Sequence, residues 1–255
     1  MLRWLPENAS SYGANIDSIF YLIYYIVAGW FVLVLGLLVY FLVRYRRREG
    51  RRAKYAAGNT LRQAAWILVP AVVVLAMDLW IDFRGAEVWD LVKRSHVRGE
   101  VLVRLNAEQF NWEIVYPGPD GKFGTKDDVK MESELHVPVD KVVSVRTHSK
   151  DVIHSLFIPT FRIKQDIIPG RDIETWFKAT KTGKFEMPCA ELCGFGHSGM
   201  KGWVIVHTAE GYEKWKKEKW RSAREGSVPA VSPKTGAARA RPADLKRLAQ
   251  SEGEK

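Results

Sequence analysis

The longest uncharged stretch of this chain, residues 18–43, limits its fold more than any other feature. It holds 26 consecutive residues without a charged side chain. A helix of that length rises about 39 Å at roughly 1.5 Å per residue, more than a hydrocarbon core of about 30 Å. A second uncharged run, Gln63–Met77, holds 15 residues before Asp78. The sequence therefore predicts a membrane protein, although its apolar content of 47% is that of an ordinary globular chain.

The segment between the two apolar runs is strongly basic. Residues 44–62 carry eight Arg and Lys residues and one acid, Glu49. The positive-inside rule places this loop in the cytoplasm, so both chain ends face outward. No cleavage pattern of small residues follows the first run, which indicates a retained helix rather than a signal peptide. We therefore expect an outer N-terminal segment over residues 1–15. A transmembrane hairpin then covers residues 16–83, with helices at about 18–43 and 63–82.

After Phe83 the sequence changes to short β-branched and aromatic runs separated by Pro, Gly or Asp, which predict a β-sandwich or barrel. The expected strands are residues 101–105, 135–139, 141–146, 152–158, 173–179 and 203–206. This domain covers residues 84–220 and closes with a helix from Ala209 to Trp220. Residues 221–255, rich in Ser, Pro, Gly and charge, predict a disordered tail.

The charge distribution argues against a nucleic-acid-binding protein. The net charge of +10 comes from the basic loop and the C-terminal segment, whereas residues 84–213 carry 18 bases and 19 acids. Nucleic-acid binding requires a basic face on a folded domain. The nearly balanced outer domain offers no such excess.

Both cysteines lie in a short segment of soft metal ligands. Cys189 and Cys193 are followed by His197 and Met200. A disulfide is the alternative in an outward-facing domain, but closing so short a loop gains little entropy and leaves the His and Met without a role. Two thiolates, an imidazole and a thioether favour copper, whereas zinc usually takes four Cys or His ligands. His154 supplies a second imidazole, and these five side chains suffice for two copper ions that share both thiolates.

Four segments closely resemble subunit II of the haem–copper cytochrome c oxidases. They are Cys189-x-Glu191-x-Cys193-Gly194-x-x-His197-x-x-Met200, Asp151-Val-Ile-His154-Ser, Ile167-Ile-Pro-Gly-Arg171 and Trp66-Ile-Leu-Val-Pro70. The likeness runs from the first helix to about Trp220. It implies a two-helix transmembrane hairpin followed by an all-β, cupredoxin-like sandwich with Greek-key topology, which holds a binuclear CuA centre.

The resemblance also implies metal ligands at matched positions. Cys189 and Cys193 would bridge the two Cu ions, and His154 and His197 would bind one ion each. Bridging thiolates spread the electron over both metals, so that little geometry changes on reduction.

Weaker ligands and supporting residues follow from the same resemblance. Met200 would be a weak ligand to one Cu, and the backbone carbonyl of Glu191 a weak ligand to the other. The Glu191 side chain would meet a Mg²⁺ ion shared with subunit I. Asp151 would support a ligand, and Arg171 would lie at a subunit interface.

The implied function is electron entry into a membrane oxidase. The chain would accept electrons at CuA from a separate periplasmic carrier, cytochrome c or similar, and pass them to haem in subunit I for O₂ reduction coupled to proton translocation. It would have no catalytic residue of its own, and would lie in a bacterial inner membrane with the copper domain on the periplasmic side. Two alternatives stay open, a CuA subunit of a nitric oxide reductase and a membrane-anchored copper-delivery protein.

The chain departs from the family pattern at three points. The aromatic patch reads Gln109-Phe-Asn-Trp112 in place of Gln-Trp-Tyr-Trp, so we expect electron entry through Phe110 and Trp112. Gln63 stands where many members carry a Glu at a proton-uptake path, and an amide cannot titrate there. A Cys-x-x-Cys-His motif for c-type haem is missing, which is why the donor must be a separate protein.

The segment Tyr116–Asp128, next to this patch, is rich in Gly, Pro and Asp. Its spacing is loosely that of a calcium loop, but it lacks the regular alternate oxygen ligands. A long hairpin turn is the favoured interpretation, and such a turn could help to select the donor.

Overall fold

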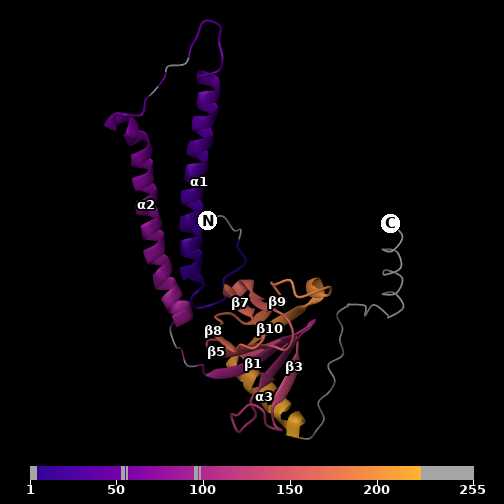
Figure 1. The fold of residues 1–255 in the computed structure, drawn as a ribbon. Coiled ribbons are helices and arrows are strands. Elements are labelled where there is room, and N and C mark those ends of the chain that lie inside the picture. The colour runs from indigo at the N-terminus through magenta and orange to yellow at the C-terminus, as the bar shows by residue number, and fades with distance from the viewer. Residues whose placement is uncertain (1–4, 53–54, 56, 95–96, 98, 225–255) are drawn as a thin grey trace, which may run out of the picture. The chain divides into compact units, whose positions relative to one another are not determined.

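The computed structural model describes residues 5–52, 55, 57–94, 97 and 99–224 (Figure 1). The chain divides into two compact units, one of residues 10–97 and one that joins residues 1–9 to residues 98–255. Most of the predicted tail, residues 225–255, lies outside the described residues. The described part of that tail, residues 221–224, continues the last helix.

The first unit is an antiparallel pair of long helices, α1 (Gly13–Arg44) and α2 (Leu61–Trp89) (Figure 1). A short π-helical segment, Asp90–Arg94, follows α2 directly. The expected helices lie within these bounds, but α2 runs well past the expected end at residue 82. Charged side chains there end the apolar run without ending the helix, and Arg84 pairs with Glu87 at 3.0 Å one turn further on.

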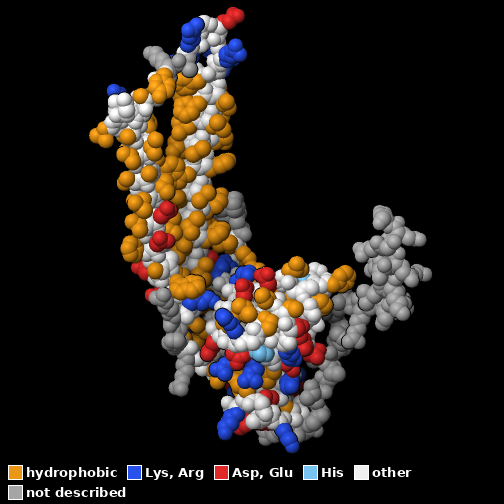
Figure 2. All heavy atoms as spheres, viewed as in Figure 1, with side chains coloured by type: hydrophobic (Ala, Val, Ile, Leu, Met, Phe, Trp, Pro, Cys, Tyr) orange, Lys and Arg blue, Asp and Glu red, His pale blue; other side chains and the backbone are white. Residues whose placement is uncertain are grey.

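Both helices expose a continuous apolar surface. Each is long and apolar enough to cross a membrane, and the most apolar 18-residue window of each is 0% buried. Figure 2 shows hydrophobic side chains over most of the visible length of both helices. Soluble monomers rarely expose so large an apolar patch. Length, composition and exposure therefore agree with the predicted transmembrane hairpin.

The second unit is a β-sandwich whose described residues form ten strands. They are β1 (Val101–Glu108), β2 (Asn111–Tyr116), β3 (Val129–Glu132), β4 (Glu134–Pro138), β5 (Val142–Ser149), β6 (His154–Ile158), β7 (Ile163–Ile167), β8 (Ile173–Lys178), β9 (Gly183–Pro188) and β10 (Lys201–His207). Their sheets have the orders β3-β2-β1-β5-β8, β4-β10-β9 and β6-β7. The β1–β5 and β4–β10 pairs are parallel, and the other pairs are antiparallel. Large side chains such as Trp112, Phe161 and Phe177 are 0% exposed in its core.

All six expected strands are present, as β1, β4, β5, β6, β8 and β10. Four more were not predicted, because charged residues interrupt their apolar pattern. Strand β9, for example, contains Lys184 and Glu186, and β7 contains Lys164 and Asp166. These side chains lie on the solvent side of strands whose other face is buried, which hides the alternation in such short segments.

The N-terminal segment adds to the β-domain. The backbone N–H of Ala9 donates to Thr160 O at 3.0 Å, and the N–H of Thr180 donates to Ala9 O at 2.9 Å. An ion pair between Glu7 and Lys181 fixes the same segment. The sequence predicted an outer segment over residues 1–15, and the structure adds that part of this segment binds the sandwich.

Candidate metal centre

The predicted ligands come from three neighbouring segments of the sandwich. His154 begins β6, Cys189 follows β9, and Met200 precedes β10. The backbone joins these segments, since the N–H of Cys189 donates to Met200 O at 3.0 Å and Leu156 forms an isolated bridge with Cys189. A 3₁₀ turn, His197–Gly199, closes the loop between them. Residues 35 positions apart in the chain therefore meet at one end of the domain.

The donor atoms of all five side chains converge. The two Sγ atoms lie 3.9 Å apart. His154 Nδ1 is 3.9 Å from Cys189 Sγ, and His197 Nδ1 is 3.5 Å from Cys193 Sγ. Met200 Sδ is 3.7 Å from Cys193 Sγ. The sequence thus identified one real cluster rather than five scattered residues.

A backbone group completes the cluster. The carbonyl oxygen of Glu191 lies 3.3 Å from Cys189 Sγ, whereas Met200 Sδ lies near the other thiol, Cys193. The Glu191 side chain is half-buried. This residue therefore presents a carbonyl and a carboxylate from the same loop.

The two cysteines are free and nearly buried, with exposed fractions of 8% for Cys189 and 3% for Cys193. Their sulfur separation of 3.9 Å is far beyond the bond length of about 2.05 Å in a disulfide. It is short enough for one metal ion to reach both sulfurs, because metal–thiolate bonds of about 2.3 Å, as for zinc, span up to about 4.6 Å. Burial, with a contribution from neighbouring Cys189, raises the pKa of Cys193 to about 11. A buried thiol of this kind ionises at neutral pH only when a cation compensates, and the donor set fits a copper centre.

A carboxylate orients the first imidazole. His154 is 0% exposed, and its Nε2 lies 2.8 Å from Asp151 Oδ1. A proton on Nε2 leaves the lone pair of Nδ1 directed toward the thiols, the tautomer that a metal requires. Burial acts to raise the pKa of Asp151, but hydrogen bonds from His154, from Gln109 N and from Val152 N outweigh it and hold the pKa below its ordinary value. Asp151 has the contacts of a ligand-supporting residue, as the resemblance implied.

The two predicted electron-entry aromatics differ sharply. Phe110 is 39% exposed and its ring lies against the ligand loop, so that a Cβ added at Gly196 would come within 2.5 Å of it. Trp112 is 0% exposed, because the alternation of β2 turns it into the core, where its ring centroid lies 6.1 Å from that of His154. Trp112, predicted with Phe110 at the point of electron entry, therefore offers no ring at the surface for a donor to contact.

Sequence reasoning missed the apolar side chains of the ligand loop itself. Phe195 is 92% exposed, Leu192 77% and Ile153 46%. The sequence did contain a signal for this exposed apolar surface, because large apolar residues stand inside a Gly-rich segment of metal ligands. Arg171, the predicted interface residue, is exposed as well.

A second histidine cluster lies under helix α3 (Ala209–Arg224) and was not predicted. His136 Nδ1 lies 2.8 Å from His207 Nε2, and the His136 ring stacks on Trp215 with a centroid distance of 4.6 Å. His136 is 7% exposed, and burial lowers its pKa to about 3. His207 ends β10, whereas Met200 and the thiols lie at its start. Because burial disfavours the charged form of His136, the histidine pair is a neutral, packed part of the core.

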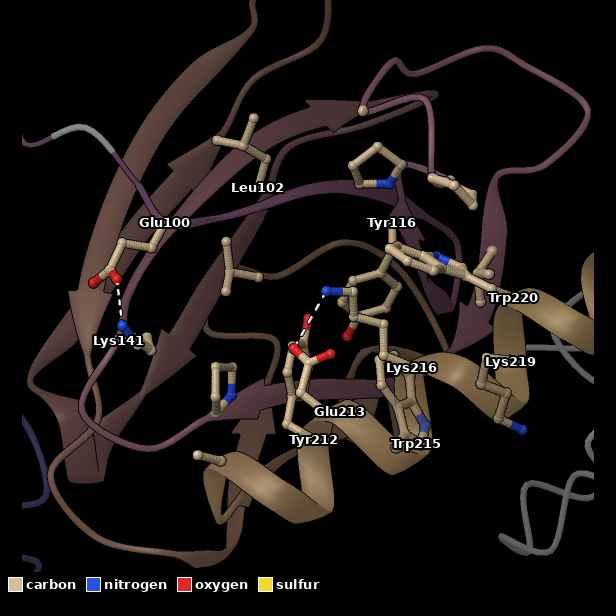
Figure 3. Close-up of a pocket in the computed structure, with 18 residues that line it drawn as sticks. Glu100, Leu102, Tyr116, Lys141, Tyr212, Glu213, Trp215, Lys216, Lys219 and Trp220 are labelled. Carbon is tan, nitrogen blue, oxygen red and sulfur yellow. Dashed lines mark hydrogen bonds and ion pairs between the residues drawn. The ribbon is translucent and has the colours of Figure 1, made fainter.

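The main pocket of the sandwich, of about 520 Å³, opens beside α3 (Figure 3). Aromatic side chains, including Tyr116 and Trp220, form much of its wall. Four of its charged groups form two pairs, Lys141 with Glu100 at 2.7 Å and Lys216 with Glu213 at 3.3 Å. None of the predicted metal ligands lines the pocket. The adjoining segment 117–128 is a turn stabilised by hydrogen bonds within the segment. Thr125 Oγ1 donates to Asp127 at 2.6 Å, and Gly124 N donates to Asp128 at 2.7 Å.

Comparison with known proteins gives matches over both units. The family "Cytochrome C oxidase subunit II, periplasmic domain" matches residues 108–208, and "Cytochrome C oxidase subunit II, transmembrane domain" matches residues 2–80. Cytochrome c oxidase subunit 2 of Thermostichus vulcanus is 30% identical over 89% of this chain and 82% of the relative. The alternative cytochrome c oxidase subunit 2 of Bradyrhizobium diazoefficiens is 30% identical over 83% of this chain and 82% of the relative.

A similar solved structure is the periplasmic domain of subunit II of cytochrome oxidase from Bradyrhizobium japonicum. It is 30% identical, with a TM-score of 0.44, and the match covers 49% of this chain and 97% of that one.

Proposed function

The chain belongs to the cytochrome c oxidase subunit II family, and on that premise we propose that its Cys–His–Met cluster holds two copper ions and is the electron-entry site of a membrane-bound haem–copper oxidase. One observation carries the proposal. The donor atoms of His154, His197 and Met200 each lie within 3.5–3.9 Å of a cysteine sulfur, and the two sulfurs lie 3.9 Å apart, in a domain that is tethered to an apolar hairpin. The nitric oxide reductase and copper-delivery alternatives gain no support from the matched families.

The residues of this chain would divide the work as follows. Cys189 and Cys193 would hold the two ions together, and His154 and His197 would each bind one. Met200, which lies near Cys193, and the carbonyl of Glu191, which lies near Cys189, would be weak ligands. When bound, a thiolate-bridged copper pair supplies a one-electron site that changes little in geometry on reduction. The buried thiols and His154 exclude water, so little solvent reorganises during transfer.

The loop surface indicates where a donor docks. Phe110, Leu192 and Phe195 are exposed beside the ligands, and apolar contacts there would bring a periplasmic cytochrome c or similar carrier close to the thiols. The outer domain is nearly neutral over residues 84–213, with 18 bases and 19 acids. We therefore expect only a modest dependence of the association rate on ionic strength.

Two further assignments rest on the family. The Glu191 carboxylate would bind a Mg²⁺ ion shared with haem-bearing subunit I, and exposed Arg171 would contact that subunit.

Gln63 is exposed in the first turn of α2, where its backbone N–H donates to Thr60 Oγ1 at 3.4 Å. Because an amide holds no proton at accessible pH, proton uptake would not use a carboxylate at this position.

Reduction kinetics of the purified oxidase test the docking surface. Stopped-flow reduction of the copper site by the native donor would be measured from low to high salt for the wild type, Phe110→Ala and a control, Leu102→Ala, an apolar residue 45% exposed on β1. We expect Phe110→Ala alone to slow association. A fall of more than about tenfold with salt, as the Debye length shrinks from about 30 to 10 Å, would reject apolar docking.

A further inference from the structure

Gln109 connects the two ligand-bearing parts of the copper cluster. It lies in the turn between β1 and β2, outside the ligand loop. Its side-chain Nε2 donates to the carbonyl of Cys193 at 2.6 Å, across 84 positions of sequence. Its backbone N–H donates to Asp151 Oδ2 at 2.7 Å, across 42 positions. One exposed residue therefore bonds to both walls of the site.

The other oxygen of the Asp151 carboxylate contacts one of the predicted copper ligands. Asp151 Oδ1 lies 2.8 Å from His154 Nε2, while His154 Nδ1 faces Cys189. The chain of contacts runs from the Cys193 carbonyl through Gln109 and Asp151 to the His154 imidazole.

The ligand loop is shaped for this contact. A Cβ added at Gly194, whose φ is +132°, would come within 2.7 Å of Gln109 Nε2. Glycine at this position is thus what lets the loop backbone lie directly against the amide. Cys193, beneath it, is only 3% exposed.

We propose that Gln109 is a positioning residue. It holds the Cys193 and His154 sides of the cluster in fixed positions relative to each other, and it acts on His154 through Asp151. The inference rests on the copper site proposed above. A neutral hydrogen bond contributes roughly 0.5–1.5 kcal/mol, which is about a threefold to tenfold effect on the equilibrium that it biases. Groups that orient metal ligands in this way reach about tenfold to a hundredfold in metal affinity.

The test compares two substitutions at Gln109 with a matched control. Gln109→Met keeps the length of the side chain and removes the donor, and Gln109→Glu keeps its shape but offers an acceptor to the Cys193 carbonyl. The control is Gln165→Met on β7, whose amide donates to Asp166 O at 3.1 Å. The full chain in detergent is used throughout, and near-ultraviolet circular dichroism monitors its global unfolding.

The first readout needs no metal. In the copper-free chain, the rate of iodoacetamide alkylation at each cysteine is followed by tandem mass spectrometry. We expect Cys193 to react at least about threefold faster in both Gln109 variants and at the wild-type rate in Gln165→Met, with similar unfolding midpoints in all three variants. Wild-type Cys193 reactivity in both Gln109 variants would overturn the proposal.

The second readout uses the copper-loaded chain. Both Gln109 variants should lose copper to a chelator about threefold to tenfold faster than the control and show altered hyperfine splitting in the electron paramagnetic resonance spectrum. An unchanged spectrum and rate of loss would overturn the positioning role. Failure of the wild type to bind copper would instead defeat the proposed function, and the alkylation rates would still test Gln109.

Discussion

Two buried imidazoles of the same sandwich have opposite surroundings. His154, at the copper end, is 0% exposed, lies 2.8 Å from a carboxylate and turns its free nitrogen toward two thiols. His136, under α3, is 7% exposed, contacts a second imidazole at 2.8 Å and stacks on Trp215. Its Nε2 lies 3.6 Å from Glu134 Oε2, beyond a normal hydrogen bond.

The comparison teaches that burial alone does not make a histidine a ligand. What distinguishes His154 is an acceptor on one ring nitrogen and soft donors beside the other. His136 instead has an imidazole at one ring nitrogen and a carboxylate only at 3.6 Å from the other, and its aromatic packing favours the neutral ring. His154 therefore has the surroundings of a metal ligand, whereas His136 has those of a neutral, packed ring.

The strongest test of this contrast replaces each histidine in turn. His154→Ala should abolish binding of the copper pair with the sandwich still folded, because the domain has its own apolar core. His136→Ala should retain full copper content but lower stability, since it removes the stack on Trp215. Metal analysis and thermal unfolding of the two variants measure this. Copper loss in His136→Ala, or its retention in His154→Ala, would break the comparison.

A second test uses pH. Burial first, and then the positive charges of His207, Lys219 and Lys184, lower the pKa of His136 to about 3 from 6.5. Between these values the unfolded chain binds more protons than the folded one, so stability falls as pH drops from about 7 toward 3. The Glu134 carboxylate faces His136 Nε2 at 3.6 Å, and its attraction for a protonated ring acts in the opposite direction. The loss should reach on the order of a few kcal/mol.

Acid unfolding, followed by near-ultraviolet circular dichroism, checks the expected slope. His136→Gln should shift the acid midpoint to lower pH. The control His148→Gln removes an exposed ring that lies 2.9 Å from Asp172 and should not produce this shift. Equal midpoints in the wild type and His136→Gln would show that His136 does not set the acid limit.

The smallest effect is expected for two buried methionines. Met200→Leu keeps the volume but removes the thioether 3.7 Å from Cys193 Sγ, so the reduction potential should shift while copper content stays nearly full. Met187→Leu, a 0% exposed residue on β9 outside the cluster, should leave the potential unchanged. Spectroelectrochemical titration separates them. Equal shifts would mean that packing, and not the sulfur, sets the potential.

Much of this molecule was predictable because its strongest signals are local. Twenty-six uncharged residues identify a membrane span, and the spacing from Cys189 to Met200 identifies a soft-metal site without any tertiary information. The supporting contacts were harder, since Gln109 meets Cys193 only across 84 positions. Hydrogen bonds of that range come from strand topology, which composition and periodicity do not specify.

The differences from the sequence-based predictions have separate origins. Trp112 was predicted with Phe110 at the point of electron entry, yet strand alternation in β2 buries its ring. His136 attracted no attention, because nothing near it in sequence indicates that His207 and Trp215 come from β10 and α3 to cover it. The end of α2 was placed too early because charge marks the edge of a membrane span and not the end of a helix.

Electron paramagnetic resonance of the copper-loaded, oxidised full chain tests the central claim most directly. One unpaired electron shared equally by two thiolate-bridged copper nuclei gives a seven-line hyperfine pattern, and we predict this pattern for the wild type and its loss in Cys193→Ser. A four-line spectrum of a single copper ion in the wild type would contradict the account, as would retention of two coppers per chain after Cys193→Ser.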